Sequence, residues 1–420
     1  MSEFIRKKIC EGVAFSSVTD DRFKIGRQSA TLIVPLSREN AAANALLSCV
    51  LSRSCREYPD FTALSRKLDS LYGAALYPSV RKAGENQMIT IAASGLEDRY
   101  ALDGESVSQE LAELLCSIIF DPDMTDGRFR EENVEQERRQ LIETIDAELG
   151  DKRQYATKRC IELMCRDELY SVSRYGSREQ VEALTNDELF RAWENLKNNA
   201  QTEITMFGST SPDKAYEGFR ARFENMPRKP VGNYIKRITP DEVKHYTETE
   251  ELAQSKLVMG FRCLGTNDGK EKLENALMSA VLGGTPTSKL FLNVREKQSL
   301  CYYCVSNVQS AKGIMMIDSG VETENIEKTE KAVLEQLSLL QNGDITGEEL
   351  DNAKLALKNS LLSSLDSLAA LQSYYTAGIL TDSLMTPAEA AEYVGSITAE
   401  RITELAQKVQ LDTVFSLVGN

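Results

Sequence analysis

The chain has 420 residues, of which 42% are hydrophobic and 27% charged, and its 49 Lys and Arg residues against 64 Asp and Glu residues give a net charge of −15. This composition is typical of a folded globular protein and excludes a disordered polyelectrolyte. The longest apolar runs fall well short of the ~18 residues that span a bilayer, and the N-terminus lacks the apolar core of a signal peptide. We therefore expect a cytoplasmic protein without membrane insertion, and the negative charge argues against nucleic acid as a partner.

The predicted elements occur in the same order in two halves of the chain. In the first half a β-branched strand precedes an apolar helix, two longer helices follow, and a short strand ends in Gly; these elements are predicted at residues 29–36, 44–51, 129–149, 155–165 and 204–208. In the second half the matching strand, first helix and closing strand are predicted at residues 255–261, 275–282 and 415–419. The two first helices share six of eight residues at an offset of 231. This order indicates an internal duplication.

A proline-rich segment separates the two halves. Met226-Pro-Arg-Lys-Pro230 is followed by Gly232 and Pro240, and proline both fixes φ and lacks a backbone donor. We predict a first domain at residues 1–226, a linker at 227–240 and a second domain at 241–420. Each domain is predicted to be α+β, with helices covering one face of a mainly antiparallel sheet.

The cysteine and histidine content limits the possible chemistry. The nine cysteines are odd in number and have no disulfide-module spacing, which favours reduced, mostly buried thiols. Cys301 and Cys304 have C-x-x-C spacing, but residues three apart on a strand point to opposite faces, so we expect two core thiols rather than a redox or metal pair. The single histidine, His245, lies among charged residues and is expected at the surface. It cannot form a two-histidine metal motif alone.

The segment after the first helix of the second half contains the best candidate for a chemical role. Gly283 and Gly284 are predicted to end that helix, and another helix is predicted at residues 288–297. Arg295 near the end of this helix and Tyr302 at the start of a strand lie seven residues apart. The planar fork of Arg and the hydroxyl of Tyr can converge on one anionic oxygen.

This segment resembles the Arg/Tyr motif of the pitrilysin/insulinase-like (mitochondrial-processing-peptidase-like) zinc metallopeptidases. The family pattern is Gly-Gly, then Ser-x-Leu-Phe, then Arg-Glu-Lys-x-x-Leu-x-Tyr. This chain has every residue of the pattern: Gly283, Gly284, Ser288, Leu290, Phe291, Arg295, Glu296, Lys297, Leu300 and Tyr302. The resemblance implies a clam of two homologous α+β domains, with Gly283, Gly284 and Ser288 as substrate-binding positions.

The other half of the family's site is degenerate in this chain. The family has an inverted zinc motif, His-x-x-Glu-His, in the first helix of the first repeat and a third Glu ligand on a later helix. Alignment of that helix places Ala45 and Cys49 at the two His positions and Ser48 at the general-base Glu. The third ligand position falls on Thr144, or on Glu143 if the register shifts by one residue. The resemblance therefore implies a chain that binds no zinc and cleaves no peptide by itself.

The resemblance also implies a partner. In two-subunit peptidases of this family, one chain has the zinc motif while the other keeps the Arg/Tyr pair. We expect a catalytic subunit that bears His-x-x-Glu-His and the zinc, with Arg295 and Tyr302 binding the carbonyl and stabilising the oxyanion of a peptide substrate. More narrowly, residues 129–137 and 151–156 are similar to the YfmF-like subgroup, the non-catalytic member of a bacterial pair of such proteins.

Two alternatives remain open. The chain could be a scaffold or peptide-binding protein of the same fold, which adds an extended peptide as an edge strand, and it could form a homodimer. It could also be an independent enzyme with Cys49 as nucleophile, although the sequence identifies no group that would deprotonate this thiol.

Overall fold

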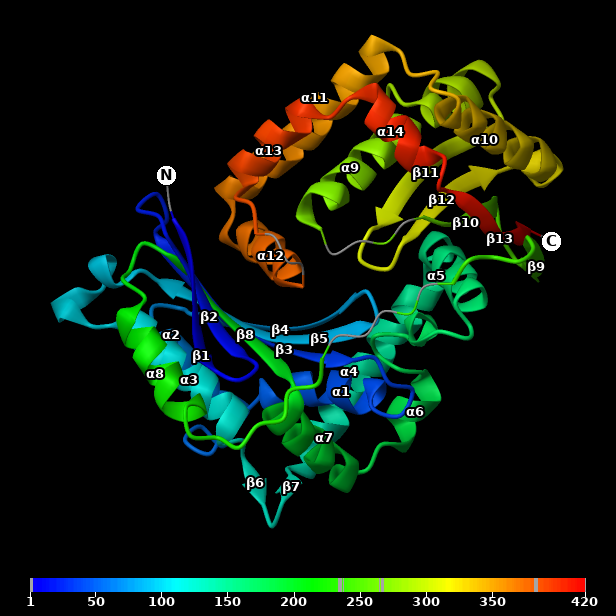
Figure 1. The fold of residues 1–420 in the computed structure, drawn as a ribbon. Coiled ribbons are helices and arrows are strands. Elements are labelled where there is room, and N and C mark those ends of the chain that lie inside the picture. The colour runs from blue at the N-terminus through cyan, green and yellow to red at the C-terminus, as the bar shows by residue number, and fades with distance from the viewer. Residues whose placement is uncertain are drawn as a thin grey trace. The chain divides into compact units, whose positions relative to one another are not determined.

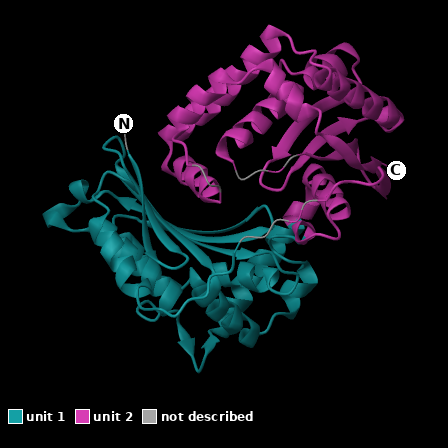
Figure 2. Cartoon of the chain, viewed as in Figure 1, with its two compact units in different colours: residues 1–146, 172–234 teal, residues 147–171, 235–420 magenta. Residues whose placement is uncertain are grey.

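A computed structural model describes residues 3–232, 236, 238–263, 265, 268–380 and 384–419. The chain divides into two compact units, Met1–Asp146 with Val172–Tyr234 and Ala147–Ser171 with Ile235–Asn420 (Figure 2). The later division between the units falls inside the predicted linker 227–240. Residues 147–171, which the sequence places in the first domain, instead group with unit 2.

Unit 1 is built on a six-stranded sheet with the order β1-β2-β8-β3-β5-β4 (Figure 1). Neighbouring strands are antiparallel except for β2 and β8, which are parallel. The strands are β1 Phe4–Cys10, β2 Val13–Thr19, β3 Ile25–Pro35, β4 Ala75–Ala83, β5 Asn86–Leu96 and β8 Gln201–Gly208. A two-stranded ribbon is formed by β6 Met124–Thr125 and β7 Arg128–Phe129.

The helices of unit 1 cover one face of this sheet (Figure 1). They are α1 Ala41–Leu51, α2 Phe61–Ser70, α3 Val107–Phe120, α4 Glu131–Gly150, α6 Arg178–Ala183, α7 Asn186–Asn199 and α8 Asp213–Phe223. Side chains alternate along a strand, so Leu32 and Val34 of β3 point to the same, buried face. On β2, the ring of Phe15 lies 5.5 Å from that of Tyr216 on α8. The helix-covered face is therefore the core of unit 1.

Unit 2 has a five-stranded sheet with the order β11-β12-β10-β13-β9, in which only β13 and β9 are parallel. The strands are β9 Lys244–Glu250, β10 Ser255–Arg262, β11 Cys301–Gln309, β12 Ile314–Val321 and β13 Gln410–Gly419. The α-helices are α5 Lys152–Met164, α9 Gly269–Ser279, α10 Ile326–Gln341, α11 Gly347–Ser363, α12 Leu368–Ile379, α13 Pro387–Ser396 and α14 Ala399–Ala406. Two π-helical segments, η4 Ala280–Gly284 and η5 Leu290–Lys297, lie between α9 and β11.

Single 3-10 turns occur in both units. They are Asp98–Tyr100 and Leu102–Gly104 in unit 1, and Leu169–Ser171, Thr323–Asn325 and Ser364–Asp366 in unit 2.

Both faces of the unit 2 sheet are covered, which explains why residues 147–171 belong to it. Leu257 and Phe261 of β10 face a core shared with α9, α10, α13 and α14. Val258, one residue along the same strand, faces the opposite side, where it packs in a cluster with Ala156 and Cys160 of α5. Without α5, this second face of the sheet would expose its apolar residues to water.

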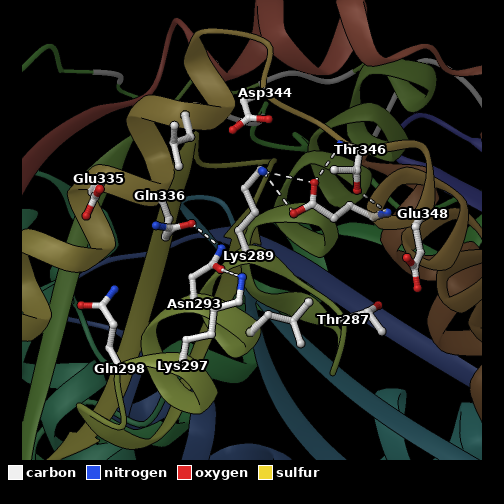
Figure 3. Close-up of a pocket in the computed structure, with 13 residues that line it drawn as sticks. Thr287, Lys289, Asn293, Lys297, Gln298, Glu335, Gln336, Asp344, Thr346 and Glu348 are labelled. Carbon is white, nitrogen blue, oxygen red and sulfur yellow. Dashed lines mark hydrogen bonds and ion pairs between the residues drawn. The ribbon is translucent and has the colours of Figure 1, made fainter.

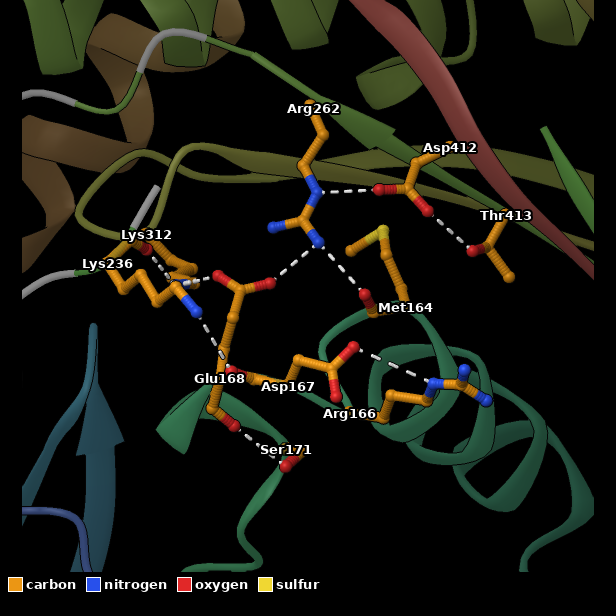
Figure 4. Close-up of polar contacts among 10 residues, drawn as sticks. All are labelled: Met164, Arg166, Asp167, Glu168, Ser171, Lys236, Arg262, Lys312, Asp412 and Thr413. Carbon is orange, nitrogen blue, oxygen red and sulfur yellow. Dashed lines mark hydrogen bonds and ion pairs between the residues drawn. The ribbon is translucent and has the colours of Figure 1, made fainter. Parts of the chain in front are cut away.

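A buried ion network joins the α5 segment to the strands (Figure 4). Nη2 of Arg262 donates to Oε1 of Glu168 at 2.7 Å, and Nε donates to Oδ2 of Asp412 at 2.8 Å. Nζ of Lys312 donates to the other oxygen of Glu168. All four residues are at most 7% exposed. Two cations and two carboxylates therefore balance one another inside unit 2.

The predicted α+β class, with sheets covered by helices, is confirmed. His245 lies at the surface, as predicted: its side chain is 59% exposed, and its Nε2 is 3.0 Å from Oε1 of Glu330. Among the helices that the structure describes, none combines the length and the apolar character needed to span a bilayer.

Candidate functional site

The three degenerate positions on α1 have no side chain suited to bind zinc. Ala45 is fully buried and carries no donor atom. The hydroxyl of Ser48 donates to the carbonyl oxygen of Ala45 within the helix at 2.8 Å. Burial raises the pKa of Cys49 to about 11, so its sulfur is a neutral thiol near pH 7. Because zinc binds the thiolate, Cys49 is a poor ligand in this setting.

On the later helix of the predicted site, α4, both predicted registers of the third ligand fall on exposed positions. Thr144 is exposed, and its hydroxyl donates to the carbonyl oxygen of Gln140 at 2.8 Å. Glu143 is exposed as well. The acidic residue of α4 that approaches Cys49 is instead Glu137, whose negative charge contributes to the raised pKa of that thiol.

Glu137 was missed by the sequence reasoning. It is 6% exposed, and Nη1 of Arg53 donates to its Oε1 at 2.7 Å. A signal was present in the sequence, because Glu137 lies between Val134 and Leu141 in the apolar stripe of α4. A charged residue in such a stripe is buried with a partner, and here that partner is a cation rather than a metal.

These donors do not fit a zinc site. Within the ranges that the structure describes, no group of three or more His, Cys, Asp and Glu side chains is arranged to hold a metal ion. The chemistry agrees with the geometry. Ala45 has no donor atom, the hydroxyl of Ser48 is already hydrogen-bonded, and the nearby carboxylate of Glu137 is paired with Arg53. The predicted zinc-motif positions and their described neighbours therefore supply neither a ligand set nor a base for an activated water.

We expect alkylation of Cys49 to be slow and strongly pH-dependent. Because its pKa is raised to about 11, the thiolate fraction and the rate should increase about tenfold per pH unit between pH 8 and pH 10. An unstructured peptide thiol, with a pKa near 8.5, should level off in this range. The rate of carbamidomethylation of the Cys49 peptide, followed by mass spectrometry, measures the difference. A plateau below pH 9 would contradict the raised pKa and would reopen the possibility of a reactive nucleophile.

The Gly-Gly and Ser positions of the second motif shape the backbone between α9 and β11. A Cβ atom on Gly283 would lie 2.7 Å from Cδ1 of Leu290 and 2.8 Å from the backbone nitrogen of Ser306, so only glycine fits. Gly284 is exposed. The buried hydroxyl of Ser288 donates to the carbonyl oxygen of Thr285 at 2.6 Å. A substrate-binding role for these three positions stays a prediction.

Arg295 and Tyr302 project from adjoining segments, because η5 packs against β11. The guanidinium of Arg295 lies 4.5 Å from the ring centroid of Phe291, and its Nη1 is 3.3 Å from Oε1 of Glu296. The side chain of Arg295 remains 37% exposed, and Tyr302 is 59% exposed. Both motif side chains can therefore be reached from solvent.

Tyr302 is the extra residue of a β-bulge. Cys301 pairs with Val321 and Tyr303 with Gly320, so Tyr302 has no partner on β12. Bulges redirect a side chain and recur beside functional sites. The Tyr302 hydroxyl donates to Oε1 of Glu322 at 2.6 Å, and this hydrogen bond raises the pKa of Tyr302. The phenol consequently stays protonated near neutral pH and keeps its capacity to donate.

The bulge also overturns the prediction for Cys301 and Cys304. The extra residue changes the alternation, because Cys301 and Cys304 pair with Val321 and Ser319, which are two residues apart on β12. The two cysteines therefore point to the same face rather than to opposite faces, and both are buried in the core of unit 2. The prediction of core positions holds, but the prediction of opposite faces is wrong.

A cavity of about 610 Å³ lies beside the same helical segment (Figure 3). Lys289, which directly precedes η5, and Asn293 of η5 are among its lining residues, and each contacts a neighbouring helix. Nζ of Lys289 lies 3.1 Å from both carboxylate oxygens of Glu349 on α11, and Nδ2 of Asn293 donates to Oε1 of Gln336 on α10 at 2.7 Å. These contacts fix the position of η5 relative to α10 and α11.

Comparison with known proteins identifies the family. Residues 177–357 match the Peptidase M16 inactive domain. The chain is 27% identical to the probable inactive metalloprotease YmfF of Bacillus subtilis (strain 168) over 97% of this chain and 96% of that protein. It is 26% identical to mitochondrial-processing peptidase subunit alpha-2 of Dictyostelium discoideum over 40% of this chain and 41% of that protein.

The fold is shared with solved structures. A conserved protein from Enterococcus faecalis V583 superposes with a TM-score of 0.91 at 25% identity, covering 99% of each chain. Together with the degenerate positions on α1, these matches lead to one conclusion. The chain is similar to the pitrilysin/insulinase-like M16 peptidases, among them a probable inactive metalloprotease, and its described residues at the zinc-motif positions form no metal site.

Proposed function

We propose that this chain is the zinc-free subunit of a heteromeric M16 peptidase and supplies Arg295 and Tyr302 to a peptide held at the zinc of a partner. The observation that carries the proposal is the asymmetry between the two motifs. The positions on α1 have lost every usable donor, whereas the Arg/Tyr segment keeps all ten residues of its pattern. A relative named as a subunit of a processing peptidase supports a multi-subunit arrangement.

The geometry of the Arg/Tyr segment suits the proposed role. Arg295 offers a planar fork to the carbonyl oxygens of an extended peptide, and its stacking on Phe291 limits its motion. Tyr302 offers a protonated hydroxyl to the oxygen that becomes negative during attack on the carbonyl. In the free chain this hydroxyl is bonded to Glu322. For catalysis at the zinc of a partner, the Tyr302 hydroxyl must break its hydrogen bond to Glu322 and donate instead to the oxyanion of the substrate.

Reconstitution tests the proposal. The purified chain should contain no stoichiometric zinc and hydrolyse no peptide alone. Mixed with an M16 protein that bears His-x-x-Glu-His, ideally one encoded beside it, it should form a complex on size-exclusion chromatography with light scattering. The complex should hydrolyse a quenched fluorescent peptide library, and chelation should abolish the activity.

The outcomes separate the proposal from its alternatives. If the partner's activity is the same with and without this chain, the subunit role is rejected and a scaffold is favoured. If the chain forms only a homodimer and binds peptides without cleavage, a peptide-binding protein is favoured. Zinc-dependent hydrolysis by the isolated chain would overturn the assignment of an inactive member.

A further inference from the structure

Two cysteines of β11, Cys301 and Cys304, lie close to Tyr302 in the sequence and point to the same face of the sheet. Cys301 and Cys304 flank the bulged Tyr302 and its neighbour on β11, and their cross-strand partners are Val321 and Ser319. Because these partners are two residues apart on β12, the cysteines are separated by about two residues of strand rise, roughly 6.6 Å. Disulfides join Cα atoms up to about 6.8 Å apart, so the spacing is near the upper end of the permitted range.

The contacts of the two thiols place them together. The side chains of Cys301 and Cys304 are hydrogen-bonded to each other, and the hydroxyl of Ser319 donates to Sγ of Cys304 at 3.1 Å. Cys301 is 8% exposed and Cys304 1% exposed. Cys301 is therefore the more accessible sulfur, while Cys304 is the inner one.

The electrostatics give the two sulfurs different roles. The hydrogen bond from Cys304 lowers the pKa of Cys301, and the positive charge of Arg295 lowers it further against the effect of burial. The same hydrogen bond, together with burial, raises the pKa of Cys304. By contrast, burial raises the pKa of Cys49 to about 11 and that of Cys116 to about 12. Because Cys301 is the more exposed sulfur and the nearby charge of Arg295 favours its thiolate, we assign Cys301 as the attacking thiol and Cys304 as the resolving thiol.

We propose that Cys301 and Cys304 form a reversible dithiol–disulfide site that reacts with low-molecular-weight disulfides. The thiolate of Cys301 attacks one sulfur of the small disulfide, whose S–S bond breaks and releases one thiolate. Cys304 then gives up its proton to the medium and attacks Sγ of Cys301, which releases the second small thiol. The protein dithiol is oxidised by two electrons, and the small disulfide is reduced to two thiols.

Oxidation would act on the Arg/Tyr segment through the bulge. Tyr302 lies within the three-residue step that the new bond would close, so its backbone and its hydrogen bond to Glu322 are constrained by the state of the two sulfurs. Since the spacing is near the upper limit for a disulfide, the bond should be easily reduced, as expected of labile rather than structural disulfides. The site does not depend on a partner subunit and is testable on the chain alone.

The experiment equilibrates the folded chain with glutathione disulfide and glutathione at several ratios, followed by alkylation and tryptic digestion. Both cysteines lie in the single peptide 298–312, because Lys297 and Lys312 bound it. We expect this peptide to lose two hydrogens in oxidising buffer and to regain them with dithiothreitol. Cys304→Ser should stop at a glutathione adduct on Cys301. Cys301→Ser should lower the reaction of this peptide at least tenfold, whereas Cys160→Ser, which removes a buried thiol elsewhere in unit 2, should not.

Two results would overturn the proposal. One is a peptide 298–312 that keeps two alkylatable thiols at every glutathione ratio in the folded wild-type chain. The other is an intramolecular bond that involves a cysteine outside this pair. Because the first readout uses only the wild-type chain, failure of a variant to fold would leave the test intact. Failure of the reconstitution with a zinc-bearing partner would likewise leave this result unaffected.

Discussion

Replacement of Arg262 by methionine is expected to lower the free energy of unfolding of unit 2 by about 3–5 kcal/mol. Arg262 bonds to both Glu168 and Asp412, and its removal leaves one buried carboxylate without a cation and the other with Lys312 alone. Urea unfolding monitored by circular dichroism measures the change. The matched control is Glu404→Gln, which removes a carboxylate that is 60% exposed and should change stability by less than about 1 kcal/mol.

One further readout, tryptic digestion, distinguishes loss of this network from general destabilisation. The α5 segment should become sensitive to trypsin at Lys152, Arg153, Lys158 and Arg159 in the Arg262→Met variant under native conditions. An unchanged digestion pattern together with a loss below 1 kcal/mol would show that the network does not fasten α5.

The same network predicts acid sensitivity. Burial alone would raise the pKa of Glu168, but hydrogen bonds from Arg262 and Lys312 outweigh it and hold the pKa below its ordinary value. The contribution of this carboxylate to stability is therefore complete above the unfolded pKa, near 4.3, and is lost as the pH falls through the lower folded pKa. Glu168→Gln should remove this part of the acid dependence.

Loss of either Arg/Tyr side chain is expected to lower turnover of the reconstituted complex by about 10²-fold, the effect of removing one oxyanion donor. Tyr302→Phe removes only the hydroxyl, and Arg295→Lys keeps the positive charge but not the planar fork. The loss should appear in kcat and should exceed any change in KM, because the interaction strengthens as charge develops on the oxygen. Peptide hydrolysis at saturating substrate measures it.

Tyr303→Phe is the matched control for Tyr302→Phe. It removes a hydroxyl from the adjacent residue of the same strand, where Tyr303 is aligned in the ladder rather than bulged. Its turnover should remain within about twofold of the wild-type complex. Equal turnover in Tyr302→Phe, Arg295→Lys and the control would reject the proposed role, while complex formation in all three variants would show that the failure is not one of assembly.

The sequence predicted those parts of the fold that depend on local patterns. The apolar runs at residues 29–36 and 44–51 correspond to β3 and α1, and the run at 415–419 lies in β13. The duplication was visible because each half repeats these patterns in order.

What the sequence could not predict depends on contacts between distant segments. Nothing local in residues 147–171 shows that Cys160 packs beside Val258, because the apolar face of α5 fits the first domain equally well by pattern. The bulge at Tyr302 was also missed, since one extra residue in a strand has no fixed signature. That single residue reversed the facing of Cys301 and Cys304. Pairing of Arg53 with Glu137 was hidden for the same reason, as the residues lie 84 apart.

The placement of α5 has a consequence for biosynthesis. The ribosome completes α5 at Met164 long before it makes β10, and the last strand that α5 covers, β13, ends at Gly419. The apolar face of the nascent helix, which includes Cys160, therefore stays exposed until residues 410–419 have also been synthesised. A chain that terminates within β13 would lack part of the strand surface on which α5 packs. Such truncated chains should therefore be prone to aggregate or to bind chaperones.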